Sequence, residues 1–330
     1  MRLGFIAGTN TLDYDPACAR AFYEAHEAFR ESISASATAA GVSVDSLLSP
    51  VPEGVVQQEL FGETGRRLAA VVLGINDVLT QLGLVPAAVG GLSLGSLIMS
   101  CAAGGIDRHS LFGVIEANRR APGPAEHDPP EATAIAVVAS GDRLLEEDGR
   151  PDGIYVGGDL GRSAHEGRLR LIMLSGHRRA LEELAAAAPE GTVTVMPHSS
   201  VAVHTPLRAS ARDYVAPTLA RIRFTDPTVA LCSGLESRTV TTADGVRELF
   251  ARNLVDRFDL TAVLDQMARH DVGLLMVLGP TLPEGFVDFP VPVLHVDAPE
   301  QVADAVGMAI DLGIQLGAPV PGLTSLGVTR

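Results

Sequence analysis

A serine between two glycines is the feature of this sequence that most suggests chemistry. It lies in the run Gly91-Leu-Ser-Leu-Gly95, which follows a short apolar stretch (86–89) and precedes a stretch of small and apolar residues (96–103). This pattern predicts a strand, a sharp turn and a helix, the arrangement known as a nucleophile elbow. Glycine is needed where a side chain would clash in the strained turn. The Ser93 hydroxyl would then stand above a sheet, at the N-terminus of a helix.

The start of that helix would also help to stabilise negative charge. Its dipole and a free backbone N–H, which we assign to Leu94, point at the place where an oxyanion would form. A G-x-S-x-G run has low specificity by itself in a chain with 34 glycines, so a noncatalytic turn is the alternative. The strand before the serine and the helix after it favour the catalytic interpretation.

Composition and charge limit the kinds of partner. The 330 residues are enough for one large or two modest domains, and no apolar run is long enough to cross a bilayer. The apolar start of the chain indicates a first strand and no cleavable signal, so we expect a cytoplasmic protein. The three cysteines lie far apart, which favours neutral thiols over a disulfide framework or a metal site.

The net charge of −15 argues against nucleic acid and anionic membranes as partners, because both need a cationic surface. An acidic protein partner would need a local basic patch. Each candidate pair is otherwise a solvated helix face. The candidates are Arg66 with Arg67, Arg119 with Arg120, Arg178 with Arg179, and Arg208 with Arg212.

The remaining pattern predicts an α/β fold in two parts. Residues 1–128 and 199–330 contain strands and helices in alternation, and we expect an α/β-hydrolase-like core with a parallel sheet. A helix from about residue 16 and a long helix over 57–82 would precede the elbow. Residues 129–198 follow a different order, namely strand, short helix, two strands, helix and strand. This order predicts an inserted ferredoxin-like subdomain.

Three separated segments of the chain resemble the malonyl-CoA:acyl-carrier-protein transacylase family. The elbow and the run 102–107 are similar to that family's G-H-S-L-G-E and A-A-G-x-[IL]-[DS] text. Residues 201–207 are similar to its histidine segment, in which the histidine is followed by [ST]-x-x-M, and residues 252–260 to its [RK]-[QN]-L-x-x-P-V-x-W segment. The similarity covers nearly all of the chain up to about residue 280 and is that of a divergent, stand-alone member.

The resemblance implies a role for several residues. Ser93 would attack a thioester carbonyl and hold the acyl group as an ester, and His204 would take its proton and later activate the incoming thiol. The backbone carbonyl of Asn253 would orient the imidazole in place of a carboxylate. The backbone N–H groups of Thr9 and Leu94 would form the oxyanion site.

The sequence departs from the family at its substrate-binding positions. Asn118 stands where the family has the arginine that binds the malonyl carboxylate, and an amide cannot form that charged, bidentate pair. Arg119 is one residue further, about 100° around the helix. Leu92 replaces a histidine, and Val203 stands where related transferases adjust the size of the pocket. We therefore expect a non-malonyl acyl group without a free carboxylate, and a bulky one is compatible with these changes.

The resulting hypothesis is a ping-pong acyltransferase of polyketide or related natural-product biosynthesis. Its substrates would be acyl-CoA or phosphopantetheinyl carrier protein, with acyl carrier protein as partner and no permanently bound cofactor or metal. Three alternatives remain open. They are a hydrolase that edits carrier-protein thioesters, a malonyl transferase in which Arg119 replaces the missing arginine, and a degenerate scaffold or carrier-binding module.

Overall fold

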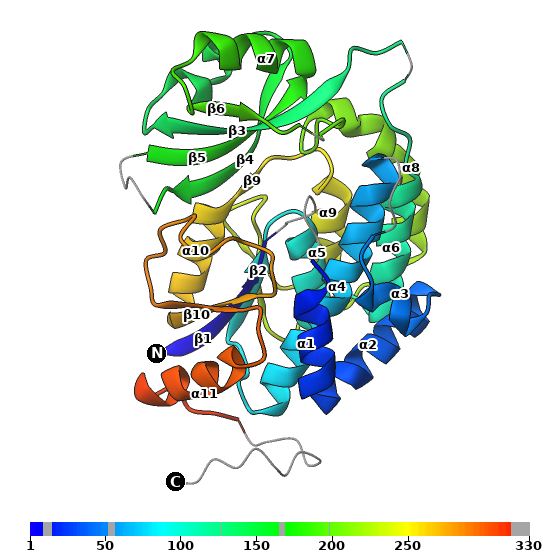
Figure 1. The fold of residues 1–330 in the computed structure, drawn as a ribbon, viewed down its shortest axis with the longest axis vertical. Coiled ribbons are helices and arrows are strands. Elements are labelled where there is room, and N and C mark those ends of the chain that lie inside the picture. Colours follow the sequence, from blue (N-terminus) through cyan, green and yellow to red (C-terminus); the bar gives the residue numbers. More distant parts are fainter. Residues whose placement is uncertain (9–14, 52–56, 126, 165–168, 198, 318–330) are drawn as a thin grey trace.

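The computed structural model describes residues 1–8, 15–51, 57–125, 127–164, 169–197 and 199–317. It contains a six-stranded sheet and a five-stranded sheet. In the view of Figure 1 the smaller sheet lies above the larger one, and helices surround the larger sheet. No helix of the described part is both long enough and apolar enough to cross a membrane.

The larger sheet has β1 and β2 next to each other near its middle, in the order β11-β10-β1-β2-β7-β8. Its strands pair in parallel, except for the antiparallel pair of β7 and β8. Parallel sheets are covered on both faces, which explains the unbroken apolar runs of the strands. The predicted parallel sheet is confirmed. Its strands are β1 (Arg2–Ala7), β2 (Ala88–Gly91), β7 (Ala230–Cys232), β8 (Thr239–Val240), β10 (Val272–Leu278) and β11 (Val293–Val296).

Helices cover the two faces of this sheet unequally. Along β1, Leu3 and Phe5 pack into one apolar cluster and Ile6 into another, because successive side chains of a strand point to opposite faces. Helix α10 (Leu260–Arg269) packs into the second cluster. In the described part of the chain, nine helices contribute to the first cluster, namely α1 (Ala17–Ala25), α2 (Glu27–Ala40), α3 (Val44–Leu48), α4 (Gln57–Gln81), α5 (Leu94–Ala102), α6 (Arg108–Arg120), α8 (Ala209–Arg221), α9 (Ala243–Arg252) and α11 (Gln301–Asp311).

The smaller sheet has the order β6-β3-β5-β4-β9. Its first four strands pair antiparallel, whereas β4 and β9 are parallel. Helix α7 (Arg178–Ala187) contacts three of its strands, and the two share an apolar cluster of their own. The strands are β3 (Glu131–Ala139), β4 (Ile154–Arg162), β5 (Leu169–His177), β6 (Val193–Val195) and β9 (Phe258–Asp259).

The expected ferredoxin-like subdomain over 129–198 stays a prediction, as does the division of the chain at its ends. Two 3-10 turns, Arg143–Leu145 and Glu147–Gly149, stand where a short helix was expected. Strand β9 also comes from outside the predicted insert. The smaller sheet is thus completed by the segment that leads into α10.

Two local predictions have clear outcomes. The single helix expected from about residue 16 is wrong, because His26 has extended dihedral angles (φ −125°, ψ 124°) and separates α1 from α2. The expected neutral thiols are confirmed, since burial raises the pKa of Cys18, Cys101 and Cys232 to about 12.

Candidate active site

Ser93 occupies the turn between β2 and α5, as the glycine pattern predicted. Its backbone has φ 51° and ψ −119°, a conformation that residues other than glycine rarely adopt. The flanking glycines allow the turn to pass closely over the end of β1. A Cβ on Gly95 would lie 2.0 Å from the Ala7 carbonyl oxygen, and one on Gly91 would lie 2.5 Å from the Gly95 carbonyl carbon. The strained turn thus lifts the Ser93 side chain away from the sheet.

This crowding predicts that Gly95→Ala disrupts the elbow. The added methyl group meets backbone atoms that cannot rotate away, so we expect the free energy of unfolding to fall by at least about 3 kcal/mol. Thermal denaturation measures the change. Gly113→Ala is the matched control, because Gly113 lies in helix α6 with no atom near its added Cβ, and alanine there is expected to stabilise by up to about 1 kcal/mol. Equal melting temperatures for both variants would contradict the packing argument.

His204 lies in the loop between β6 and α8, and its side chain reaches Ser93. Its Nε2 is 2.7 Å from Ser93 Oγ, and its Nδ1 is 2.9 Å from the backbone oxygen of Asp256. A carbonyl oxygen can only accept a hydrogen bond, so the neutral ring carries its proton on Nδ1 and accepts the Ser93 hydroxyl proton at Nε2. His204 also has a left-handed backbone (φ 59°), and its N–H donates to the Leu254 carbonyl. Both members of the pair are therefore held in strained conformations.

The acceptor of the His204 ring is Asp256 and not Asn253, so the predicted carbonyl was wrong. Asn253 ends α9, and the chain then makes a further turn in which the N–H groups of Val255 and Asp256 donate to the Arg252 carbonyl. This turn brings the Asp256 carbonyl to the ring. The Asp256 carboxylate accepts a 2.6 Å hydrogen bond from Arg252 instead.

Burial makes His204 a neutral base. The side chain is packed edge-on against the Phe258 ring, with the ring centres 5.0 Å apart, and the residue is 4% exposed. Desolvation lowers the pKa of His204 to about 4, although the Asp256 carbonyl and charge act in the opposite direction. At neutral pH the ring is therefore uncharged and able to accept the serine proton.

The start of α5 offers one donor for an oxyanion. Ser93 caps the helix, so the N–H of Leu94 has no carbonyl one turn before it to bond. Within the described ranges this N–H makes no hydrogen bond. The second predicted donor, Thr9, lies outside the described residues.

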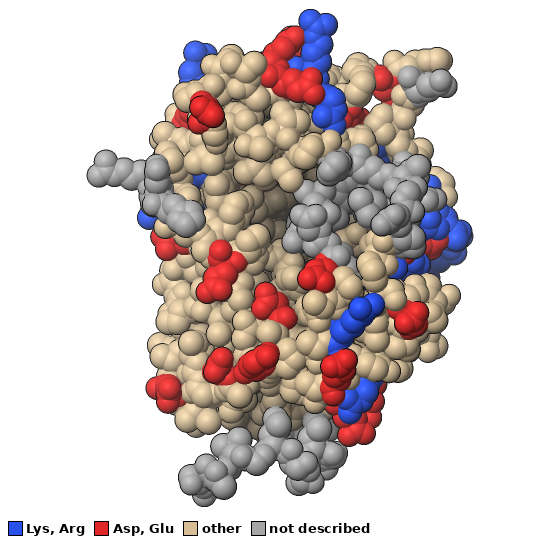
Figure 2. Space-filling view, viewed as in Figure 1, with Lys and Arg blue, Asp and Glu red and all other residues tan. Residues whose placement is uncertain are grey.

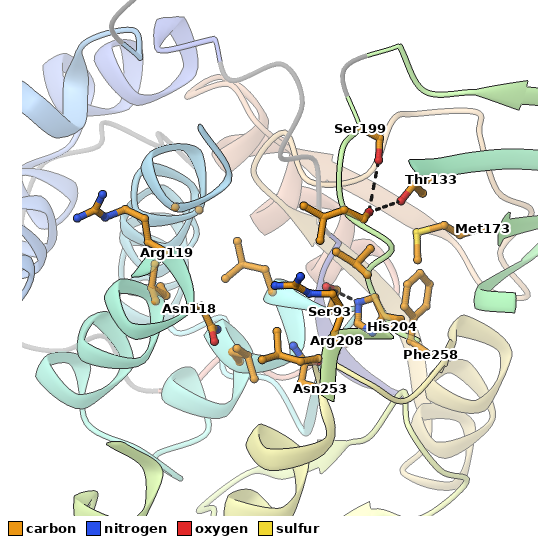
Figure 3. A pocket seen from close by; sticks show the side chains of 18 of the residues that line it. Ser93, Asn118, Arg119, Thr133, Met173, Ser199, His204, Arg208, Asn253 and Phe258 are labelled. Carbon is orange, nitrogen blue, oxygen red and sulfur yellow. Dashed lines mark hydrogen bonds between the residues drawn. The ribbon is translucent and has the colours of Figure 1, made fainter. Parts of the chain in front are cut away.

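A cavity of about 280 Å³ lies beside the Ser93 and His204 pair (Figure 3). Helices α4, α5 and α6, strands β3 and β5 and the loops around residues 196–208 and 253–258 line it. Ten of the described lining residues are apolar, and the large polar ones are Asn118, Arg119, His204, Arg208 and Asn253. The apolar lining consists of Leu94, Leu97, Ile115, Ile135, Met173, Met196, Val201, Val203, Leu254 and Phe258.

The predicted substrate-binding residues divide into two groups. Val203 and Asn118 line the cavity as expected, and so does part of Arg119. The Arg119 guanidinium nevertheless points away from the cavity in Figure 3 and donates two 2.8 Å hydrogen bonds to the Glu116 carboxylate. The prediction for Leu92 was wrong, because this residue does not line the cavity but is 1% exposed and packs in the second cluster, which also contains Ile6.

Arg208 is a cavity residue that the sequence analysis misassigned to a surface pair. It is 6% exposed, and in Figure 3 its guanidinium points into the cavity. A cation other than Arg119 therefore lies in the pocket, although we expected an acyl group without a free carboxylate. The sequence did contain a sign of this position, because Arg208 lies four residues after His204, where the resembled family has methionine.

The other candidate basic pairs are at the surface or held by neighbours. On the face shown in Figure 2, acidic side chains are spread over the lower part, and basic ones gather at the right edge and the top. Arg120, Arg179 and Arg212 are exposed, and each forms an ion pair with a nearby carboxylate. Which basic patch meets a carrier protein stays a prediction.

Known proteins that are similar to this chain belong to the family that its motifs resemble. No family model matches the chain. The malonyl CoA-acyl carrier protein transacylase of Escherichia coli is 31% identical over 111 residues, which are 33% of this chain and 36% of that protein. The chain thus matches only about a third of the length of this curated relative.

Solved structures share the fold over almost the whole chain. The transacylase of Coxiella burnetii has a TM-score of 0.79 at 16% identity and covers 93% of this chain and 97% of its own. The acyltransferase domain of the salinomycin polyketide synthase has a TM-score of 0.76 at 20% identity, covering 96% of this chain and 74% of that one. A malonyl-transacylase in complex with its type II polyketide carrier protein has a TM-score of 0.76 at 18% identity, covering 93% and 100%. The chain is thus similar to malonyl-CoA:acyl-carrier-protein transacylases, in sequence over a third of its length and in fold over almost all of it.

Proposed function

We propose that the chain is an acyltransferase that moves an acyl group from a coenzyme A or carrier-protein thioester to the phosphopantetheine thiol of an acyl carrier protein. The observation that carries this proposal is the 2.7 Å contact between Ser93 Oγ and the Nε2 of a buried His204, at the wall of an apolar cavity. The relatives named above are acyl-carrier-protein transacylases and polyketide synthase domains. A role in polyketide or related natural-product biosynthesis is part of the proposal.

The first half-reaction forms an ester on Ser93. Its Oγ attacks the thioester carbonyl carbon while His204 Nε2 takes the hydroxyl proton, and the resulting oxyanion accepts a hydrogen bond from the Leu94 N–H. The carbon–sulfur bond then breaks, and the leaving thiolate takes the proton from Nε2. Through both steps the Asp256 carbonyl keeps the ring in one tautomer and orientation.

The second half-reaction reverses the first with a new thiol. The incoming phosphopantetheine thiol gives its proton to His204 Nε2, and its sulfur attacks the ester carbonyl. The bond to Ser93 Oγ breaks, and the oxygen recovers a proton from Nε2. The apolar cavity walls disfavour water at the ester, which supports transfer over hydrolysis.

The acyl group is proposed to differ from malonyl. Helix α6 presents Asn118 to the cavity at the position of the family's arginine, and the Arg119 guanidinium is paired with Glu116 outside it. At the position of the family's arginine, a malonyl carboxylate would therefore meet an amide and not a cation. The apolar side chains around Ser93 suit a longer carbon chain.

Intact-protein mass spectrometry tests the function directly. The purified protein is incubated with a panel of acyl-CoA and acyl-carrier-protein thioesters, and unloaded carrier protein is then added. We expect one acyl adduct on Ser93 that disappears as the carrier gains the same mass. Loss of the adduct at an equal rate without carrier would show hydrolysis, and absence of an adduct with every donor would overturn the proposed function.

A further inference from the structure

We propose that Arg208 selects acyl groups that end in a carboxylate, by forming an ion pair with that carboxylate inside the cavity. The inference rests on the proposed function and specifies its substrate class as thioesters of dicarboxylic acids longer than malonate. The specificity residue would then lie on the turn between His204 and α8, and not on α6.

Arg208 is a buried cation without a compensating anion. Its Nη2 donates a 3.2 Å hydrogen bond to the Pro122 carbonyl. In the part of the chain that the structure describes, no carboxylate oxygen lies within 4.0 Å of the Arg208 guanidinium nitrogens, which is the limit for an ion pair. The carboxylate of Glu131 acts on it only electrostatically and accepts a 2.7 Å hydrogen bond from the Ala202 N–H. A guanidinium has five N–H donors in a planar fork, so most of this fork is available to a ligand.

An unpaired buried arginine destabilises the fold unless an anion pairs with it in the working enzyme. Removing an unpaired charge from water costs several kcal/mol, and burial accordingly lowers the pKa of Arg208. Methionine, which the resembled family has here, would fill an apolar wall without this cost. A carboxylate on the substrate would restore the missing partner through a bidentate pair.

Two amides lie on the same side of the cavity as Arg208. In Figure 3, Asn118, Asn253 and Arg208 lie to the left of the Ser93 and His204 pair, and Met173 and Phe258 lie to its right. The side-chain oxygens of Asn118 and Asn253 are buried and, among the described residues, have no hydrogen-bond partner. Amide oxygens only accept hydrogen bonds, so these two are available to a donor group of a ligand and not to its carboxylate. Thr133 and Ser199 lie on the side of Met173 in Figure 3, so polar groups line both sides of the cavity.

The anion must belong to the acyl group, because of where Arg208 lies. Its guanidinium and Ser93 share one buried cavity, so a ligand of Arg208 lies close to the reacting carbonyl. The phosphates of coenzyme A and of the carrier protein are separated from the thioester sulfur by the whole pantetheine arm. A carboxylate at the far end of a short acyl chain is the anion that fits this position.

The test compares donors of equal length that differ only in their end group. The rate constant of Ser93 acylation is measured by intact mass for succinyl-CoA against butyryl-CoA and for glutaryl-CoA against pentanoyl-CoA, with malonyl-CoA against propionyl-CoA as the short pair. The wild-type protein is expected to favour the longer carboxylated donors by about 10- to 100-fold. Arg208→Met should remove this preference, so that succinyl-CoA and butyryl-CoA acylate Ser93 at similar rates. Arg208→Lys should retain part of it, because lysine keeps the charge but not the fork.

The control is Arg212→Met, one turn further along the chain, where the arginine is exposed and pairs with Asp213. It should acylate with wild-type rates for every donor. Equal loss with all donors in Arg208→Met would mean that Arg208 binds coenzyme A or supports the fold, and would overturn the proposal. So would a wild-type preference for the uncharged donors, a result that needs no variant. Absence of any Ser93 adduct would instead remove the proposed function and the inference with it.

Discussion

Ser93→Ala is expected to abolish the acyl adduct and to lower acyl transfer by about 10³- to 10⁶-fold. The oxygen that would attack the thioester is removed, and the chain has no second hydroxyl in contact with His204 within its described part. Residual transfer would come only from binding and from the oxyanion donor. Intact mass after incubation with the best donor, followed by peptide mapping, measures the effect.

Ser199→Ala is the matched control for this variant. Ser199 also lines the cavity, but its hydroxyl contacts the Val201 carbonyl and not His204. It should form the adduct at a rate within a few fold of wild type. Peptide mapping that found the adduct on another residue in Ser93→Ala would show that the elbow serine is not the nucleophile.

The strained backbone of Ser93 separates a catalytic loss from a folding defect. Alanine keeps the side-chain clash of a left-handed residue, whereas glycine removes it. The free energy of unfolding of Ser93→Gly should therefore equal that of Ser93→Ala or exceed it by up to about 1 kcal/mol. Both variants should be equally inactive. Strained backbone conformations are expected at reactive residues, because function there requires the conformation.

The elbow was predictable because its signal is local. Glycines at 91 and 95 are required by the turn itself, and the apolar run before them can only be a buried strand. The parallel sheet followed in the same way from strands without a polar face, such as β10. His204 was found through its place in a longer matched segment, because one histidine among nine has no local signature.

The errors concern features that depend on how distant segments meet. The carbonyl that orients His204 belongs to Asp256, and a backbone acceptor leaves no trace in residue type. Leu92 and Ser93 are adjacent, yet Ser93 lines the cavity whereas Leu92 packs in the second apolar cluster. Arg208 and Arg212 were paired as surface residues, although only packing against the segment around Pro122 decides which one is buried.

The shortest elements were also beyond sequence analysis. Strand β9 has only two residues, and too short a segment shows no alternation of apolar and polar residues. Its Phe258 nevertheless packs in an apolar cluster with residues of both sheets, and it also contacts His204 and lines the cavity. The site therefore depends on an element that only the assembled fold reveals.

His204→Asn is expected to lower acylation by about 10²- to 10⁴-fold, since it removes the base but not the nucleophile. Asparagine is chosen because it tolerates the left-handed backbone of this position better than most residues do. His109→Asn on the exposed side of α6 is the control and should acylate normally. Wild-type rates in His204→Asn would contradict the assigned role of the ring.

His204 also determines how acylation and stability depend on pH, and a buried ring gives a different dependence from a solvated ring. Because the pKa of His204 is about 4 in the folded protein, acylation should stay constant from pH 8 to about pH 5.5 and fall with a midpoint near pH 4. In the unfolded chain a histidine titrates near pH 6.5, so between pH 6.5 and pH 4 the unfolded state binds the extra proton. The stability contributed by the neutral ring is therefore present above pH 6.5 and is lost as the pH falls, by about 3 kcal/mol in total.

Denaturant titrations of wild type and His204→Asn at pH 7, 5.5 and 4.5 isolate this contribution, because the other titrating groups are shared. The wild type should lose more stability than the variant over this range. Parallel losses, or an acylation midpoint near pH 6.5, would mean that the ring is hydrated in the free enzyme. Water would then also reach the ester on Ser93, and hydrolysis would become the favoured outcome over transfer. The pH profile of the free enzyme thus bears on the choice between thiol and water as acceptor.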